Sequence, residues 1–406
     1  MFCNGNGACY NYDPKDAMCP SWKGTRERIH SPKGRASLTR EWLRLMSQQG
    51  VDLSQTPEKG VNALFSLPKR IKNTVGKWRG EYDFSHEVNH AMQGCLACKS
   101  CVGQCPIKVN VPEFRSRFLE AYYSRYLRPA KDYLVGGLEY MIPTLARFPA
   151  PYNTLMNNAL VKRLLRQYGG MVDSPAICTY PLIKGLQSRG IDFATPERLL
   201  KLTDAQRSKS VVLVQDAFTS YFETPLVLDV VDLLGELGFN VLVAPFLPNG
   251  KPLHVHGFMQ AFEKAARKNS VMLKGLASTD VPLIGIDPSM TLTYRQEYEK
   301  AGYGVPEVQL IQEWLAQHLT QLAPLSEQLP AREYYYLPHC TEKTSAAPSL
   351  KQWQEIFKGL GQSLHIQPVG CCGMSGTYGH ETANLKTSKK IYELSWAEVV
   401  ADEQKQ

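Results

Sequence analysis

The sequence predicts an α+β multidomain protein, mostly helical at first and built from alternating strands and helices after about residue 210. Three observations lead to this prediction. The 406 residues exceed what one ordinary core accommodates, seven of the eleven cysteines lie within the first 105 residues, and short apolar runs of strand length begin near Ser210. The expected units are residues 1–168, a linker at 169–209, and two α/β units at 210–325 and 326–406.

The first unit contains several helical patterns. The apolar residues of 38–49 have helical spacing, and a basic, irregular stretch follows as far as Tyr82. Val111-Pro112-Glu113 is typical of a helix start, because proline and an acidic residue are both favoured in the first turn. Amphipathic helices are predicted at residues 113–127, 130–147 and 152–168. The prolines and weak periodicity of residues 171–209 favour a linker that lies across a surface.

Strands and helices alternate in the second part, which is typical of a parallel sheet. The first round of elements comprises a strand at 211–214, a helix at 225–237, a strand at 241–244, a helix at 255–268, a strand at 281–286 and helices at 291–300 and 307–321. The second round comprises a strand at 334–337, a helix at 348–360, a strand at 364–369 and a helix at 381–400. Since the order repeats, we expect an internal duplication.

Composition limits the class of protein. Hydrophobic residues make up 43% and charged residues 21%, no stretch of eighteen apolar residues occurs, and the N-terminus has no signal-peptide pattern, so a cytoplasmic protein without a transmembrane segment is expected. The net charge is +8, with basic residues dense at 23–44 and 69–79. Because no nucleic-acid motif accompanies them, a solvated surface is favoured over a nucleic-acid partner, while peripheral contact with an anionic membrane or an acidic subunit stays open.

One cysteine run carries most of the functional information. The run Cys95-x2-Cys98-x2-Cys101-x3-Cys105-Pro106 has the spacing of a bacterial ferredoxin, in which three thiolates bind one [4Fe–4S] cluster and the fourth cysteine binds a neighbouring one. A zinc site is the alternative, but zinc requires four ligands in two pairs and does not account for three cysteines in tandem. In the reducing cytosol, disulfides between these cysteines are not expected.

A second cluster is predicted from the N-terminal cysteines. Cys3, Cys9 and Cys19-Pro20 form a run that also ends in Cys-Pro. By the same exchange of ligands, Cys19 completes the cluster of Cys95, Cys98 and Cys101, and Cys105 completes the cluster of Cys3 and Cys9. That second cluster lacks one cysteine, since Asn6 occupies the middle position. A non-cysteine ligand, a three-iron cluster and an empty site remain alternatives.

Three later cysteines form another candidate site. Cys371 and Cys372 follow a predicted strand and are flanked by glycines, while Cys340 ends another strand next to His339. The carboxyl ends of parallel strands lie at one edge of a sheet, where these thiols can bind a metal. Buried free thiols are an equally good interpretation, and the lone Cys178 is interpreted as an ordinary thiol. The first round has no cysteine at the equivalent turns, Pro248-Asn249-Gly250 and Asp287-Pro288.

Two phrases, Cys3-Asn-Gly-Asn-Gly-Ala-Cys9 and Gly370-Cys-Cys-Gly-Met-Ser-Gly-Thr-Tyr-Gly379, resemble the C-terminal half of bacterial FAD-linked oxidases of the D-2-hydroxyglutarate and D-lactate dehydrogenase type. The iron–sulfur subunits of glycolate oxidase and anaerobic glycerol-3-phosphate dehydrogenase are similar. The resemblance implies an α-helical ferredoxin domain followed by a tandem cysteine-rich domain with a CCG motif. It also implies that the seven N-terminal cysteines are cluster ligands and that Cys340, Cys371 and Cys372 belong to the cysteine-rich motif.

The function implied by this resemblance is electron transfer from FAD on a partner or a missing domain to an acceptor, either a quinone or an electron-transfer protein. No dinucleotide fingerprint lies between a strand and a helix, so the chain alone is not expected to oxidise a hydroxy acid. The alternative is an enzyme similar to heterodisulfide reductase, with thiol or disulfide chemistry at the CCG site. A further Cys-x2-Cys found in those enzymes is missing after Cys372.

Overall fold

The computed structural model describes residues 3, 5–51 and 66–402 of the chain. The first helices surround the cysteine runs, and they are α1 (Pro20–Thr25), α2 (Pro32–Gln48), α4 (Leu67–Trp78), α5 (Ser85–Gln93), α6 (Ser100–Gln104) and α7 (Val111–Arg125). Ser31 and Asn110 begin α2 and α7, because each side chain accepts a hydrogen bond from the backbone N–H three residues later. The helices predicted at 38–49 and 113–127 are confirmed with shifted bounds. Residues 52–65 of the predicted basic stretch lie outside the described residues.

Short helices follow in series: α8 (Ala130–Gly136), α9 (Leu138–Leu145), α10 (Pro149–Asn157), α11 (Ala159–Leu164) and a π-helical turn at Leu165–Gly169. The sequence predicted two unbroken helices here, at 130–147 and 152–168, and the structure divides both. The division at Asn158 has a clear cause, since its side chain accepts a hydrogen bond from the Leu160 N–H at 2.9 Å and begins α11. Local capping therefore overrides the apolar periodicity.

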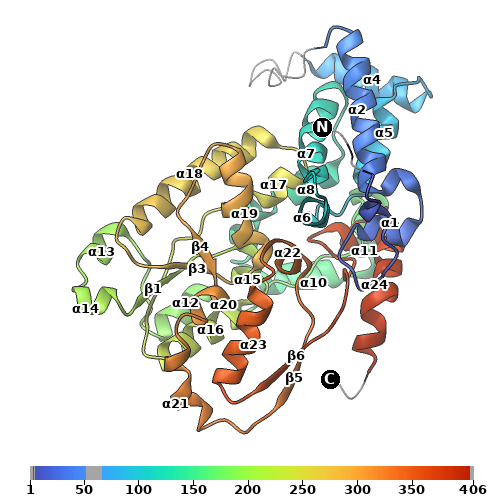
Figure 1. The fold of residues 1–406 in the computed structure, drawn as a ribbon. Helices are drawn as coiled ribbons and strands as arrows, with labels where there is room; N and C mark the ends of the chain where they lie inside the picture. Colours follow the sequence, from blue (N-terminus) through green and yellow to red (C-terminus); the bar gives the residue numbers. More distant parts are fainter. Residues whose placement is uncertain (1–2, 4, 52–65, 403–406) are drawn as a thin grey trace.

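A parallel sheet of four strands organises the second part, in the order β2-β1-β3-β4 (Figure 1). Its strands are β1 (Ser210–Leu213), β2 (Asn240–Val243), β3 (Leu283–Gly285) and β4 (Val308–Leu310). Its helices are α15 (Ala217–Tyr221), α16 (Thr224–Glu236), α17 (Lys251–Val255), α18 (Met259–Ala277), α19 (Pro288–Lys300) and α20 (Ile311–Leu315). The prediction of a helix at 307–321 is wrong at its N-terminal end, because Val308–Leu310 form strand β4.

Both faces of this sheet are buried. Val211 and Leu213 of β1 pack with α16 and α20 on one face, whereas Val212 packs with α18 and α19 on the other. The segment at 169–209 holds α12 (Leu182–Ser188), α13 (Pro196–Leu200) and α14 (Asp204–Arg207). Leu186 joins the first core and Leu199 the second. The segment expected to be a surface linker thus contributes side chains to both cores.

The last part has a smaller sheet. Strands β5 (Glu333–Tyr336) and β6 (Ser363–Ile366) pair in parallel, and the helices around them are α21 (Ala323–Ser326), α22 (Cys340–Ser345) and α23 (Ser349–Gly359). Ile356 of α23 is buried in the same core as α16, so this second round shares its core with the first. The expected duplication reproduces the order of elements, but with two strands in place of four.

The final helix, α24 (Leu385–Val400), packs against α1 and lies beside the N-terminal helices (Figure 1). Gly24 permits this contact, because a Cβ there would lie 3.0 Å from Ile391 Cγ1. Helices near the two ends of the described chain are therefore neighbours. Across the described ranges, no helix combines the length and apolar character needed to cross a bilayer.

Glu139 connects the helical part to the four-stranded sheet. Its carboxylate is fully buried on α9 and accepts hydrogen bonds from the backbone N–H groups of Asn249 at 3.0 Å and Gly250 at 2.7 Å. Burial nevertheless raises the pKa of Glu139 from 4.5 to about 7, because the ionised carboxylate loses its hydration. The connection therefore depends on pH.

We expect the Glu139 carboxyl to make the protein less stable as the pH rises from about 4.5 to 7. In that range the folded state holds a proton that the unfolded state has released, so the free energy of unfolding falls with pH. The difference in pKa corresponds to about 3 kcal/mol. Urea unfolding at a series of pH values measures this slope, and Glu139→Gln should flatten it. An equally steep slope in that variant would contradict the assignment.

Candidate metal centre

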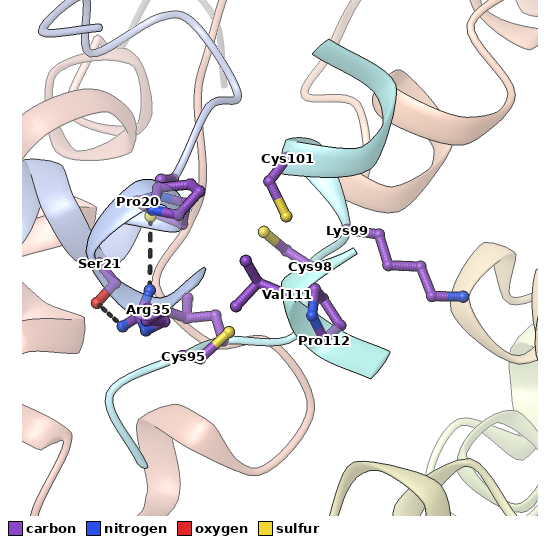
Figure 2. A pocket seen from close by; sticks show the side chains of 12 residues that line it. Pro20, Ser21, Arg35, Cys95, Cys98, Lys99, Cys101, Val111 and Pro112 are labelled. Carbon is purple, nitrogen blue, oxygen red and sulfur yellow. Dashed lines mark hydrogen bonds between the residues drawn. The ribbon is translucent and has the colours of Figure 1, made fainter. Parts of the chain in front are cut away.

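Four of the predicted cysteine ligands line one cavity. Cys19 immediately precedes α1, Cys95 and Cys98 lie on the loop between α5 and α6, and Cys101 lies in the first turn of α6. The labelled sulfurs of Cys95, Cys98 and Cys101 point into the cavity (Figure 2). Arg35 and Val111 are among the other residues that line it. The sequence runs at 19 and 95–101 are thus brought together as the exchanged-ligand pattern predicts.

The backbone of the cysteine loop is curled by left-handed residues. Ala97 has φ of 55° and Lys99 has φ of 61°, and Cys19 across the cavity has φ of 36°. Such residues cost of order 1–3 kcal/mol each and occur mainly at functional sites. Alternating right- and left-handed residues turn successive N–H groups into a concavity that binds anions, including the sulfides of iron–sulfur clusters. The loop geometry therefore suits an anionic group.

This loop allows a paired test at Ala97. Ala97→Val is expected to lower the unfolding free energy by roughly 1–2 kcal/mol and to weaken metal retention, because a β-branched residue is strained at positive φ. Ala97→Gly adopts the same conformation without that strain and should retain metal as well as the parent chain. Iron content and thermal unfolding of the two variants measure the difference. Equal behaviour of the valine and glycine variants would show that the curl is unimportant.

Burial favours the protonated thiols of Cys19, Cys98 and Cys101 in the absence of metal. It raises the pKa of Cys98 to about 12, with the neighbouring Cys340 adding to the shift, and it raises the pKa of Cys101. Burial also raises the pKa of Cys19, although the positive charge of Arg35 opposes the shift. Thiolates here therefore require a cation that replaces their protons, as metal ligands do.

The second cysteine site lies against the first. Helix α22, which begins at Cys340, packs on α6, and Cys340 is close enough to Cys98 to influence its pKa. The thiol of Cys371 interacts with both Cys340 and Cys372 and lowers the pKa of each to about 6. The three predicted thiols are therefore gathered together, and the choice between metal ligands and free thiols stays open.

The loop that follows Cys372 supports the first site. Ser375 Oγ donates a hydrogen bond to the Leu96 carbonyl at 2.6 Å, and Tyr378 Oη donates to the Gly94 carbonyl at 3.5 Å. Leu96, Cys371 and Tyr378 share one small apolar cluster. These hydrogen bonds and apolar contacts connect the CCG segment to the backbone of the loop that carries Cys95 and Cys98.

The remaining N-terminal cysteines are more exposed. Cys3 Sγ accepts a hydrogen bond from Lys33 Nζ at 3.8 Å, and Cys9 is near enough to Cys3 and Lys33 for both to affect its pKa. Asn6 accepts a hydrogen bond from the Ala8 N–H at 3.3 Å. Cys105 directly follows α6, and its pairing with Cys3 and Cys9 stays a prediction. Cys178 stands apart, with its thiol near the Tyr180 carbonyl.

The gathered cysteines do not form a site for a single ion. Within residues 3, 5–51 and 66–402, no three or more His, Cys, Asp or Glu side chains are arranged around one metal position. A zinc site needs four ligands that converge on one point. In a cubane cluster each thiolate binds a different iron, so four cysteines around a cavity fit that group better than they fit zinc.

Sequence reasoning missed the buried basic residues beside the cavity. The stretch at 23–44 was interpreted as a solvated surface, yet Lys23 and Arg35 are buried, and so is Lys99 between two of the cysteines. Lys23 pairs with Asp16 at 3.8 Å, and Lys99 pairs with Glu297 at 2.6 Å. Composition alone does not distinguish such residues from exposed ones. The position of Lys99 inside the cysteine run was the one available signal.

No family model and no solved structure matches the sequence. The chain is 55% identical over 399 residues to D-2-hydroxyglutarate dehydrogenase of Pseudomonas putida and 46% identical over 403 residues to that of Escherichia coli. Each match covers 98% of this chain and 39% of the relative, so the chain spans about two fifths of their length. A 26% identity over 202 residues links 48% of the chain to one of the subunits of the anaerobic glycerol-3-phosphate dehydrogenase of Escherichia coli. The chain is therefore similar to oxidoreductases over nearly its whole length.

Proposed function

From this similarity to D-2-hydroxyglutarate dehydrogenases and from the cavity lined by four cysteines, we propose that the chain is the iron–sulfur electron-transfer module of an FAD-linked D-2-hydroxyacid dehydrogenase. It accepts electrons from reduced FAD on another part of the same polypeptide or on a partner protein. It passes them to a quinone or an electron-transfer protein. The hydroxy acid is D-2-hydroxyglutarate or a related compound such as D-lactate, and the module works in the cytoplasm.

The proposed cofactor is a [4Fe–4S] cluster bound by Cys19, Cys95, Cys98 and Cys101, which would move one electron at a time. The chain itself would supply four thiolates, N–H groups from the curled loop, and a wall that includes Leu96 and Val111. The proposed architecture is an α-helical ferredoxin-type domain followed by a tandem cysteine-rich domain. A second cluster at Cys3, Cys9 and Cys105 belongs to the proposal, with its fourth ligand unassigned.

Metal analysis of the purified chain after anaerobic reconstitution with iron and sulfide tests this function. Iron and sulfide in equal amounts, with broad absorbance in the blue region that dithionite bleaches, are expected. Four iron atoms per chain correspond to one cubane cluster and about eight to two. A folded chain that takes up zinc and no iron would refute the proposal.

A second function is favoured by the contact of Cys371 with Cys340 and Cys372 beside Cys98. In that case the three thiols carry out thiol or disulfide chemistry, as in heterodisulfide reductase, and the cluster supplies the electrons. Cys371→Ser separates the two functions when the chain is coupled to its flavoprotein. A simple relay continues to reduce a dye in that variant, whereas a thiol-dependent enzyme loses its turnover.

A further inference from the structure

Arg35 is an unusual residue for the wall of this cavity. Its side chain projects from α2 and is only 1% exposed, which makes it one of the largest fully buried side chains of the described residues. Its guanidinium donates to the carbonyls of Ala91 at 2.8 Å and His30 at 2.5 Å and to Ser21 Oγ at 2.8 Å. Longer contacts reach Cys19 Sγ at 3.7 Å and His30 Nδ1 at 3.5 Å. All five N–H groups therefore have a partner.

None of these partners carries a negative charge in the absence of metal. Within the residues that the structure describes, no carboxylate lies within 4.0 Å of the Arg35 guanidinium. The buried Lys23 and Lys99 differ, because each has a carboxylate partner. Arg35 is thus a buried cation whose counter-charge is missing from the protein groups around it.

A buried charge without a counter-charge is costly, since hydrogen bonds to neutral groups replace hydration only in part. The cavity beside Arg35 offers the place for an anion. A cubane cluster with four thiolates carries net negative charge, which grows by one electron on reduction. On binding iron, Cys19 loses the proton that it now donates to the His30 carbonyl, and its sulfur becomes a full acceptor for Arg35 Nη1.

Gly94 makes this arrangement possible. A Cβ at this position would lie 2.9 Å from His30 Nδ1 and 3.5 Å from Arg35 Nη2. The residue that directly precedes Cys95 therefore has to be small, so that His30 and the guanidinium can approach the cysteine loop. The absence of a side chain at Gly94 therefore allows the Arg35 guanidinium to lie close to the cysteine loop.

We infer that Arg35 is a positioning residue that provides the buried counter-charge of the cluster at Cys19, Cys95, Cys98 and Cys101 and raises its reduction potential. The inference rests on the proposed function. Hydrogen bonds to sulfur and local charge are among the features by which a protein sets a cluster potential. Because reduction adds negative charge beside a fixed cation, Arg35 favours the reduced cluster.

A redox titration of the reconstituted full chain, followed by absorbance and electron paramagnetic resonance, tests this role. Arg35→Gln is expected to weaken electron binding by about tenfold, which is 59 mV for a one-electron couple. Arg35→Lys keeps the charge and should stay closer to the parent potential. Arg40→Gln is the matched control, because Arg40 lies on the same helix but is exposed. The reduction potential of the cluster in this variant should equal that of the parent chain.

The outcomes separate this inference from the proposed function. A parent chain without a cluster refutes the proposed function itself. A parent chain with a cluster, together with an unchanged potential in Arg35→Gln, overturns the role of Arg35 alone. If Arg35→Gln retains no cluster, iron binding restored by Arg35→Lys supports the need for a charge. Failure of that lysine variant to restore iron would show that hydrogen bonding, and not charge, is what Arg35 contributes, and would overturn the inference.

Discussion

Cys98→Ser is expected to cause a large loss of electron transfer through the proposed cluster at the cavity. Cys98 lies between the two left-handed residues of the loop, and its sulfur points into the cavity. A serine hydroxyl is a poor substitute for a thiolate on iron. Replacing a residue that hydrogen-bonds to a metal ligand typically lowers metal affinity or activity 10–100-fold. Replacing a ligand itself should therefore lower them by more than about 100-fold. Iron content and the rate of dye reduction by the chain with the proposed flavoprotein partner measure the loss.

The neighbouring thiol requires a second variant in this experiment. Cys340 lies close enough to Cys98 to raise its pKa, so its thiol is the candidate substitute for the lost ligand. The double variant Cys98→Ser, Cys340→Ser removes this substitute and should show the full loss. Cys178→Ser is the matched control, since Cys178 lies apart from both sites and its loss should leave iron content unchanged. Full iron content in the double variant would exclude Cys98 as a ligand.

Glu297→Gln is expected to give the largest loss of stability. Glu297 is buried on α19, and its two carboxylate oxygens pair with Lys99 at 2.6 Å and with Lys251. Both lysines hold the pKa of Glu297 well below its usual range, against the opposing effect of burial. Removing the charge leaves the buried Lys99 ammonium and the half-buried Lys251 ammonium without this anion, which costs about 3–5 kcal/mol. Urea and thermal unfolding should both show the loss.

This triad also reaches the cysteine loop. The Lys99 side chain points away from the cavity (Figure 2), toward Glu297 and Gln296 of α19. Glu297→Gln should therefore loosen the loop and lower iron retention as well as stability. Lys251→Met leaves Lys99 paired with Glu297, so it should lower the free energy of unfolding less than Glu297→Gln does. Glu299→Gln, at an exposed position of the same helix, should change neither property. Equal stabilities of the 297 and 299 variants would contradict this account.

The strands and the cysteine pattern could be predicted because each depends on local sequence. The apolar run at 211–214 is buried on both faces of a parallel sheet, and Cys95, Cys98 and Cys101 are near enough in the sequence to line one cavity. The helices at 130–147 and 152–168 were predicted too long, since capping by Asn158 competes with periodicity.

Features that depend on distant contacts could not be predicted in this way. The prolines of 171–209 gave no indication that Leu186 and Leu199 reach two different cores. Periodicity placed a helix near 381–400 but could not show that it packs on α1. Arg35 looked like any other basic residue of a charged stretch, because its burial depends on Ala91 and Ser21, which come from other segments.

The contact between α1 and α24 has a consequence for biogenesis. Cys19 is synthesised well before the residues that form α24, so α1 gains this partner only after Leu385–Val400 has been translated. A nascent chain stalled before Leu385 would leave its thiols open to oxidants and to competing zinc.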